Sequence, residues 1–176
     1  MAIQVGFLRA VNLGKRRVPM ARLVEVCTDL GHASPWTFVN SGNVVFEAPG
    51  RRASLEKGLE SALEDEFGFE CTTFVRSAAQ LRTALALAPF TVGSGDTYFV
   101  TFLKAKPSGA AAHALEALSN EFETLVVDGC EVHWRMHGKS TDSQLVKRDW
   151  ERILGVNTST SRNTTMLTKL LAKIDA

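Results

Sequence analysis

The chain has 176 residues, of which 45% are apolar and 22% charged, and its formal net charge at pH 7 is +1. These proportions are ordinary for a soluble globular protein, and the balanced charge argues against a dedicated nucleic-acid-binding domain, which is usually strongly basic. Three widely spaced cysteines without a CxxC pair exclude a disulfide framework. Because the sequence also lacks a signal-peptide pattern and an apolar run of about 18 residues, we expect a cytoplasmic protein that does not span a membrane.

The first part of the chain alternates strand-like and helix-like patterns. Residues 2–9 alternate apolar and polar side chains as a half-buried strand does, and Val18-Pro19 suits the first turn of a helix that ends before Gly31. Ser41-Gly42 separates two β-prone runs, which is typical of a tight hairpin. The elements predicted here are a strand at 2–9, a helix at 18–30, strands at 35–40 and 43–48, a helix at 54–67 and a strand at 69–76.

The second part partly repeats this order of elements, with Asp128-Gly129 as a second hairpin signal. Its predicted elements are a connecting helix near 77–88, a strand at 97–103, a helix at 108–119, strands at 122–127 and 130–136, and helices at 142–154 and 162–174. The sequence therefore predicts an α+β fold of two tandem ferredoxin-like subdomains. The first, residues 1–76, has the order β-α-β-β-α-β. The second, residues 77–176, has the order β-α-β-β-α and then an extra C-terminal helix.

A basic loop follows the first predicted strand. Lys15, Arg16 and Arg17 precede a helix start, where the partial positive charge of the helix favours acidic side chains instead. In the predicted topology the third strand lies antiparallel between the first two, so the end of the first strand and the hairpin at 40–43 share one edge of the sheet. Guanidinium, amide and hydroxyl groups that converge near a helix N-terminus commonly hold phosphate or carboxylate. The sequence therefore predicts a site for a small anionic ligand at this edge.

The last predicted helix has a similarly basic start. Its polar lead-in, residues 157–165, offers Thr160 or Ser161 as the N-cap and places Arg162 and Asn163 in the first turn. We include these two residues in the candidate ligand-binding set. The complete set is Arg9, Asn12, Gly14, Arg17, Ser41, Gly42, Asn43, Arg162 and Asn163.

Other interpretations of the same residues stay open. The motif side chains can instead bond to the backbone and hold the fold together, in a protein-interaction module without a small-molecule site. A nucleic-acid-associated module that uses Lys15, Arg16 and Arg17 against phosphates is the weaker alternative, because the overall charge is balanced.

The sequence assigns no reaction, cofactor, metal or oligomeric state, since no nucleophile, acid–base pair or ligand cluster emerges. His133 and His137 are the nearest approach to a metal motif. On a strand, residues at this spacing lie about 13 Å apart, too far to share one ion. We therefore expect both histidines on a polar strand face.

Three stretches of the sequence, "FLRAVNLGKRRVPMARL", "FVNSGNVVFEA" and "TSRNTTMLTKL", together resemble the bacterial family known as domain of unknown function 1697. The resemblance spans essentially the whole chain and implies two ferredoxin-like subdomains, but no reaction, since the family has no established activity. The matching positions are Arg9, Asn12, Gly14, Arg17, Val18, Met20, Ser41, Gly42, Asn43, Arg162, Asn163, Lys169 and Leu170. The departures are Lys15 for a usual glycine, Asn40 for a usual glutamine, Thr164 for a common aromatic residue, and the two residues Thr165 and Met166.

Overall fold

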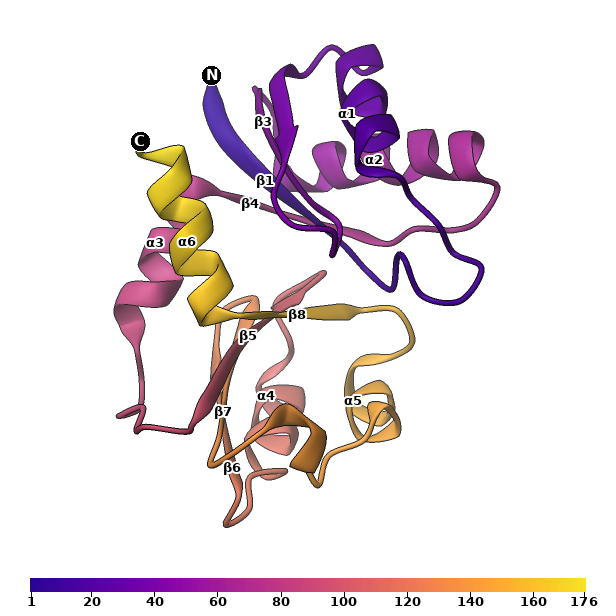
Figure 1. Ribbon diagram of the computed structural model, residues 1–176. Coiled ribbons are helices and arrows are strands. Elements are labelled where there is room, and N and C mark those ends of the chain that lie inside the picture. Colours follow the sequence, from indigo (N-terminus) through magenta and orange to yellow (C-terminus); the bar gives the residue numbers. More distant parts are fainter. The chain divides into compact units, whose positions relative to one another are not determined.

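The computed structural model describes residues 1–176, and the chain divides into two compact units, Met1–Leu81 and Arg82–Ala176 (Figure 1). Both units are α+β, and each contains one four-stranded antiparallel sheet. Helix α3 (Ala78–Leu87) runs across the boundary between them.

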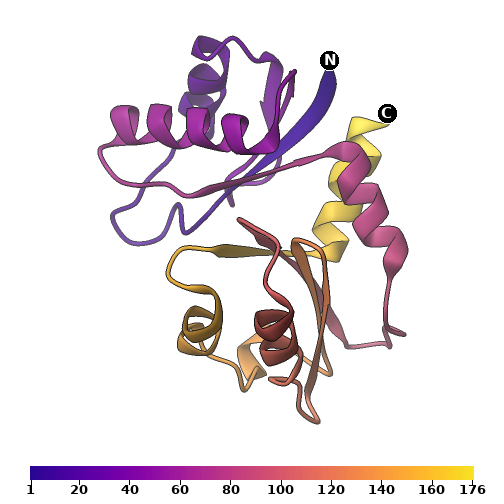
Figure 2. The same ribbon diagram turned by 180° about the vertical axis from the view of Figure 1, so that it is seen from behind.

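The first unit has one helix-covered sheet. Its elements are β1 (Ala2–Leu8), α1 (Met20–Asp29), β2 (Ala33–Thr37), β3 (Asn43–Ala48), α2 (Arg52–Phe67) and β4 (Thr73–Ser77). The strand order is β2-β3-β1-β4, so β3 lies between β1 and β2 and is antiparallel to both. Helices α1 and α2 lie on one face of the sheet (Figure 2), over a core that includes Leu23, Phe46 and Leu59.

Side chains close the outer edge of β4. Because β4 pairs only with β1, alternate N–H groups of this strand face away from the sheet. Each of these groups donates to a side-chain oxygen: Thr73 to Glu60 Oε1 at 3.0 Å, Val75 to Glu56 Oε1 at 3.0 Å and Ser77 to Gln80 Oε1 at 2.8 Å. An open strand edge is a template for pairing with another chain, and these three oxygens occupy the donors that such pairing needs.

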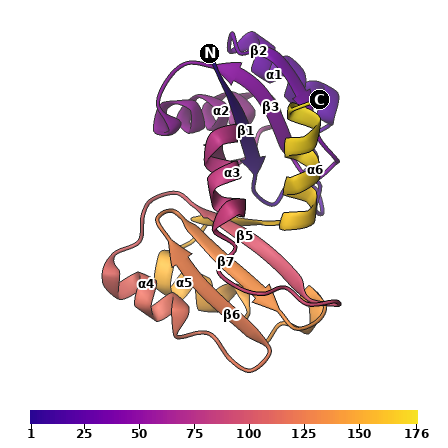
Figure 3. The same cartoon turned by 90° about the vertical axis from the view of Figure 1, so that its left-hand side faces the viewer.

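The second unit repeats the arrangement. Its elements are β5 (Thr97–Leu103), α4 (Gly109–Glu116), β6 (Glu123–Asp128), β7 (Glu131–Met136), the 3₁₀ turn η1 (Ser140–Asp142), α5 (Lys147–Leu154), β8 (Ser159–Asn163) and α6 (Thr164–Ile174). The strand order β6-β7-β5-β8 matches that of the first sheet, position for position. Helices α4 and α5 cover a core that includes Leu115 and Val132. Arg82 of α3 forms an ion pair with Asp175, just after α6. Figure 3 shows the two helices concerned, α3 and α6.

The second unit has one strand more than the sequence predicts. Residues Ser159–Asn163 form β8, which pairs with β5, so the order is β-α-β-β-α-β and the predicted β-α-β-β-α order is wrong. The segment STSRN contains no apolar residue and therefore shows no alternation, the main sequence signal of a strand. The last helix begins at Thr164, and its N-cap is Asn163, whose Oδ1 accepts from the Thr165 N–H at 2.8 Å. The predicted caps Thr160 and Ser161 lie inside the strand instead.

Helix α5 is shorter than the predicted helix at 142–154, because it begins at Lys147. The buried Glu123 carboxylate holds the preceding segment by accepting from Ser143 Oγ at 2.5 Å and from the Gln144 N–H at 2.8 Å. These bonds keep the segment in a non-helical path.

Candidate functional site

The loop at 9–19 and the turn at 38–42 adjoin, as the sequence predicts. The Leu8 N–H donates to Gly42 O at 2.8 Å, and Asn12 Nδ2 donates to Asn40 O at 2.9 Å. Gly42 has a φ of +79°, and a Cβ built there would lie 2.6 Å from Val11 Cγ2. Only glycine therefore allows the turn to approach the loop this closely.

Asn12 fixes the course of the loop. The side-chain Oδ1 of Asn12 accepts from the Val18 N–H at 3.0 Å, and its Nδ2 donates to the turn. Both polar atoms of the side chain therefore form hydrogen bonds with backbone groups. Its own N–H donates to Arg16 O at 2.6 Å, and its φ of +58° is in the left-handed region. Asparagine adopts this region more readily than most residues. Asn12 therefore holds the loop in place, and both polar atoms of its side chain bond within the protein.

The three consecutive cations have different surroundings. The Arg16 side chain packs against the protein surface, with its guanidinium 4.5 Å from the ring centre of Phe69. Its Nε donates to Ala10 O at 3.0 Å, and its Nη2 donates to Glu70 O. Lys15 and Arg17 are exposed and form no ion pair. The guanidinium of Arg17 only donates to Asn12 O, at 3.3 Å. Two uncompensated positive charges thus stand on an ordered loop.

The turn residues mostly bond to each other. Asn43 is fully buried, and its Nδ2 donates to Phe38 O at 2.9 Å and to Ser41 Oγ at 2.8 Å. Val39 has a φ of +53°, a strained conformation for a β-branched residue. Gly14, at the tip of the facing loop, is exposed. Strained backbone of this kind is often found at functional surfaces.

Seven of the nine candidate residues belong to the first unit, and Arg162 and Asn163 belong to the second. Arg9 is half-buried and donates its N–H to Thr72 O at 2.9 Å. Arg162 is 9% exposed, and its Nη1 donates to Thr160 Oγ1 at 2.8 Å and to Ser161 O at 3.0 Å. Burial lowers the pKa of the Arg162 guanidinium to about 10. Arg162 lies in strand β8, so the prediction that it lies in the first turn of a helix is wrong.

A buried polar pair on the second sheet was not predicted from the sequence. His133, predicted on a polar face, is fully buried, and its Nδ1 lies 2.5 Å from Tyr98 Oη. Burial raises the pKa of Tyr98 to about 12 and lowers that of His133, so the hydrogen bond joins a neutral phenol and a neutral imidazole. The pair is invisible in sequence because Tyr98 and His133 come from different strands, β5 and β7.

Glu123 is a second buried group that the sequence does not single out. Besides the two donors from the 143–144 segment, it accepts from Trp134 Nε1 at 3.0 Å and from Asn120 Nδ2 at 3.2 Å. Burial alone would raise the pKa of Glu123, but these hydrogen bonds outweigh it and lower the pKa. All four donors are neutral groups of the fold, so Glu123 acts as an anchor.

Two kinds of feature are absent from the structure. No group of three or more His, Cys, Asp or Glu residues is arranged to hold a metal ion. No helix is both long and apolar enough to cross a membrane.

Two antiparallel sheets, each with helices on one face, define an α+β protein built from two similar units. Residues 1–133 match the family described as "Protein of unknown function (DUF1697)", and the chain belongs to this family. Among solved structures, the conserved bacterial protein SP0830 from Streptococcus pneumoniae has a TM-score of 0.80 and 19% sequence identity, with 100% of this chain and 99% of that chain covered. No curated protein matches the chain. At this identity the neighbour establishes the fold alone.

Proposed function

We propose that the protein binds a small anion, a phosphate- or carboxylate-bearing ligand, where the loop at 9–17 meets the turn at 40–43. The observation that carries the proposal is that Lys15 and Arg17 are exposed and form no ion pair, on a loop that Asn12 fastens to the turn. An anion can approach these cations without displacing a carboxylate, and the loop needs little ordering on binding. The proposed site uses residues of the first unit only.

The motif residues divide into two roles in this proposal. Asn12, Gly42 and Asn43 set the geometry, since their contacts are made within the protein. Lys15 and Arg17 supply the charge. Because both cations are exposed, each contact with an anion is closer to the value of about 1 kcal/mol in bulk water than to the value of about 4 kcal/mol near a less hydrated surface. We expect modest affinity that decreases as salt is added.

Calorimetric titration with inorganic pyrophosphate at low ionic strength tests the proposal. We expect saturable binding to the wild-type protein and at least about tenfold weaker binding to the double variant Lys15→Ala/Arg17→Ala. The matched control is Arg51→Ala/Lys57→Ala, which removes the same charge from exposed positions at the start of α2. Equal weakening in both variants would attribute binding to net charge, and no binding to wild type would refute the proposal for this anion.

A protein-interaction surface is the second candidate, because apolar side chains also stand at this edge. Leu13 is 63% exposed and Val39 is 52% exposed, on the two segments that Asn12 joins. Exposed apolar residues beside ordered backbone suit a protein partner. A pull-down from bacterial lysate should then retain a partner with wild type and lose it with Leu13→Ser/Val39→Asn, at an unchanged melting temperature.

We also propose that both units are ferredoxin-like and that the protein is cytoplasmic. The shared strand order, with the third strand of each unit between the first two, supports the first statement. The second statement is supported by Cys27, Cys71 and Cys130, which form no disulfide, since reduced cysteines are typical of a reducing compartment.

A further inference from the structure

The two units can be compared residue by residue, because equivalent backbone bonds recur at the end of the first strand of each. The Leu8 N–H donates to Gly42 O at 2.8 Å as Leu103 donates to Cys130 O at 2.9 Å, and the Arg9 N–H donates to Thr72 O at 2.9 Å as Lys104 donates to Thr158 O at 3.2 Å. The place where β5 ends therefore corresponds to the place where β1 ends, the edge described above.

The connection that follows this strand differs between the units. In the first unit, residues 9–19 separate β1 from α1, whereas in the second only residues 104–108 separate β5 from α4. The longer connection folds back so that Arg16 lies against Phe69 and bonds to Ala10 O and Glu70 O. The shorter one is too short to contain a residue equivalent to Arg16.

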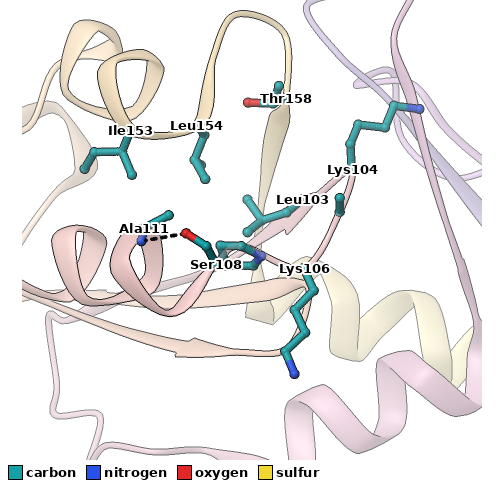
Figure 4. A pocket seen from close by; sticks show the side chains of 10 residues that line it. Leu103, Lys104, Lys106, Ser108, Ala111, Ile153, Leu154 and Thr158 are labelled. Atoms are coloured by element: carbon teal, nitrogen blue, oxygen red, sulfur yellow. Dashed lines mark hydrogen bonds between the residues drawn. The ribbon is translucent and has the colours of Figure 1, made fainter.

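A pocket of about 260 Å³ opens beside this shorter connection, and all of residues 104–108 line it (Figure 4). Leu103, Ala111, Ile153 and Leu154, from β5, α4 and α5, give it an aliphatic wall. The volume is just below the range of about 300–1,000 Å³ typical of drug-sized ligands, so the pocket suits a small one.

The polar rim of the pocket is basic. Lys104 and Lys106 line it, and no acidic residue does. Figure 4 shows both lysine side chains leaving the rim, away from the aliphatic wall. Lys106 is exposed and forms no ion pair, and its long flexible stem can bring the ammonium group back over the opening.

We propose that this pocket binds a small aliphatic carboxylate, with its chain against the wall and its carboxylate at Lys106. In the first unit the corresponding position is filled by an aliphatic stem with a charged head, the Arg16 side chain, whose cationic head meets carbonyl oxygens. In the second unit the rim is cationic, so an occupant of the same shape carries a negative head. This site is separate from the anion site proposed at Lys15 and Arg17.

Calorimetric titration with octanoate tests the inference, with octyltrimethylammonium as a ligand of similar chain and opposite head charge. We expect saturable octanoate binding, no comparable binding of the cation, and a loss of about tenfold or more in Ala111→Leu, which fills the pocket. Ala117→Leu is the matched control, because Ala117 is exposed beyond the other end of α4. Equal octanoate binding by Ala111→Leu and wild type would overturn the proposal.

Lys106→Glu tests the head group without altering the wall, and Lys139→Glu is the control at an exposed lysine that does not line the pocket. We expect Lys106→Glu to lose octanoate binding and to gain binding of octyltrimethylammonium, with Lys139→Glu like wild type. Octanoate binding that survives in Lys106→Glu would refute the assigned head-group position. The Lys15→Ala/Arg17→Ala variant should bind octanoate normally, which separates this inference from the anion site of the first unit.

Discussion

Asn12 forms three hydrogen bonds within the first unit, two through its side-chain amide and one through its own N–H. It bonds to the turn at Asn40, to the start of α1 at Val18 and, through its own N–H, to Arg16. A side chain with two backbone partners affects stability more than its partial exposure suggests, because its loss leaves the Val18 N–H and the Asn40 carbonyl without their protein partner.

We expect Asn12→Ala to lower the free energy of unfolding by about 2–3 kcal/mol, through lost hydrogen bonds and the cost of alanine at a φ of +58°. Asn12→Gly loses the same bonds but tolerates the positive φ, so it should be less destabilising by about 1 kcal/mol. Urea denaturation of the three proteins measures both differences. Wild-type stability of Asn12→Ala would show that the amide bonds contribute nothing to the fold.

His133 makes stability depend on pH. Burial lowers the pKa of His133 below 6.5, and the nearby Asp128 and Glu131 carboxylates only partly oppose this. As the pH falls below 6.5, the unfolded chain takes up a proton that the folded imidazole resists, so the folded state loses stability. His133→Asn keeps an acceptor for Tyr98 but cannot titrate.

We therefore expect wild type to lose more unfolding free energy than His133→Asn between pH 7.5 and pH 5. The comparison with the variant is necessary because burial also lowers the pKa of His32, which remains in both proteins. Urea denaturation at the two pH values measures the difference. Identical pH dependence in the two proteins would mean that the buried imidazole titrates normally.

At the scale of elements, β4 depends on α2 for its unpaired edge. Glu56 is buried, accepts from the Val75 N–H, and lies 3.8 Å from the guanidinium of the fully buried Arg76. Glu56→Ala should lower the unfolding free energy by about 3 kcal/mol, because it leaves a buried cation with a partner fewer and a strand N–H unsatisfied. Glu56→Gln, which keeps the acceptor, should lose less. Thermal denaturation of the two variants tests this prediction. Equal melting temperatures for Glu56→Ala and Glu56→Gln would contradict it.

The elements that could be predicted from sequence are those whose apolar residues recur at a helical or strand period. The strand at 97–103 is found with its predicted bounds, and α1 begins directly after Val18-Pro19. β8 could not be predicted, since a strand of serine, threonine, arginine and asparagine is formed by its pairing with β5 and not by its own pattern. The start of α5 was likewise set by a distant carboxylate, Glu123.

At the scale of the whole molecule, the topology rule correctly predicted that the loop at 9–17 meets the turn at 40–43. It could not predict which side chains stay available there. In the structure Asn12 and Arg16 bond to the backbone of the protein, whereas Lys15 and Arg17 are exposed, and no periodicity in the sequence distinguishes these neighbours. The pocket beside α4 and α5 could not be predicted either, because its lining residues come from segments far apart in the sequence, 103–111 and 153–158.

The two proposed sites should respond differently to salt, because the molecule as a whole has a net charge of only +1 and attraction must come from local charges. The site at Lys15 and Arg17 is electrostatic and exposed, so screening weakens it as the Debye length falls from about 10 Å at 0.1 M salt to about 3 Å at 1 M. The pocket at Leu103 and Leu154 also gains free energy from removing an aliphatic chain from water, which salt does not screen.

Raising sodium chloride from about 0.1 M to about 1 M should therefore weaken pyrophosphate binding about tenfold, and octanoate binding by about threefold or less. Parallel calorimetric titrations of one preparation measure both, and Lys106→Ala should abolish most of the salt dependence that octanoate shows. A parallel decline of the two ligands would indicate that both bind through charge alone, and the aliphatic wall would then have no part in recognition.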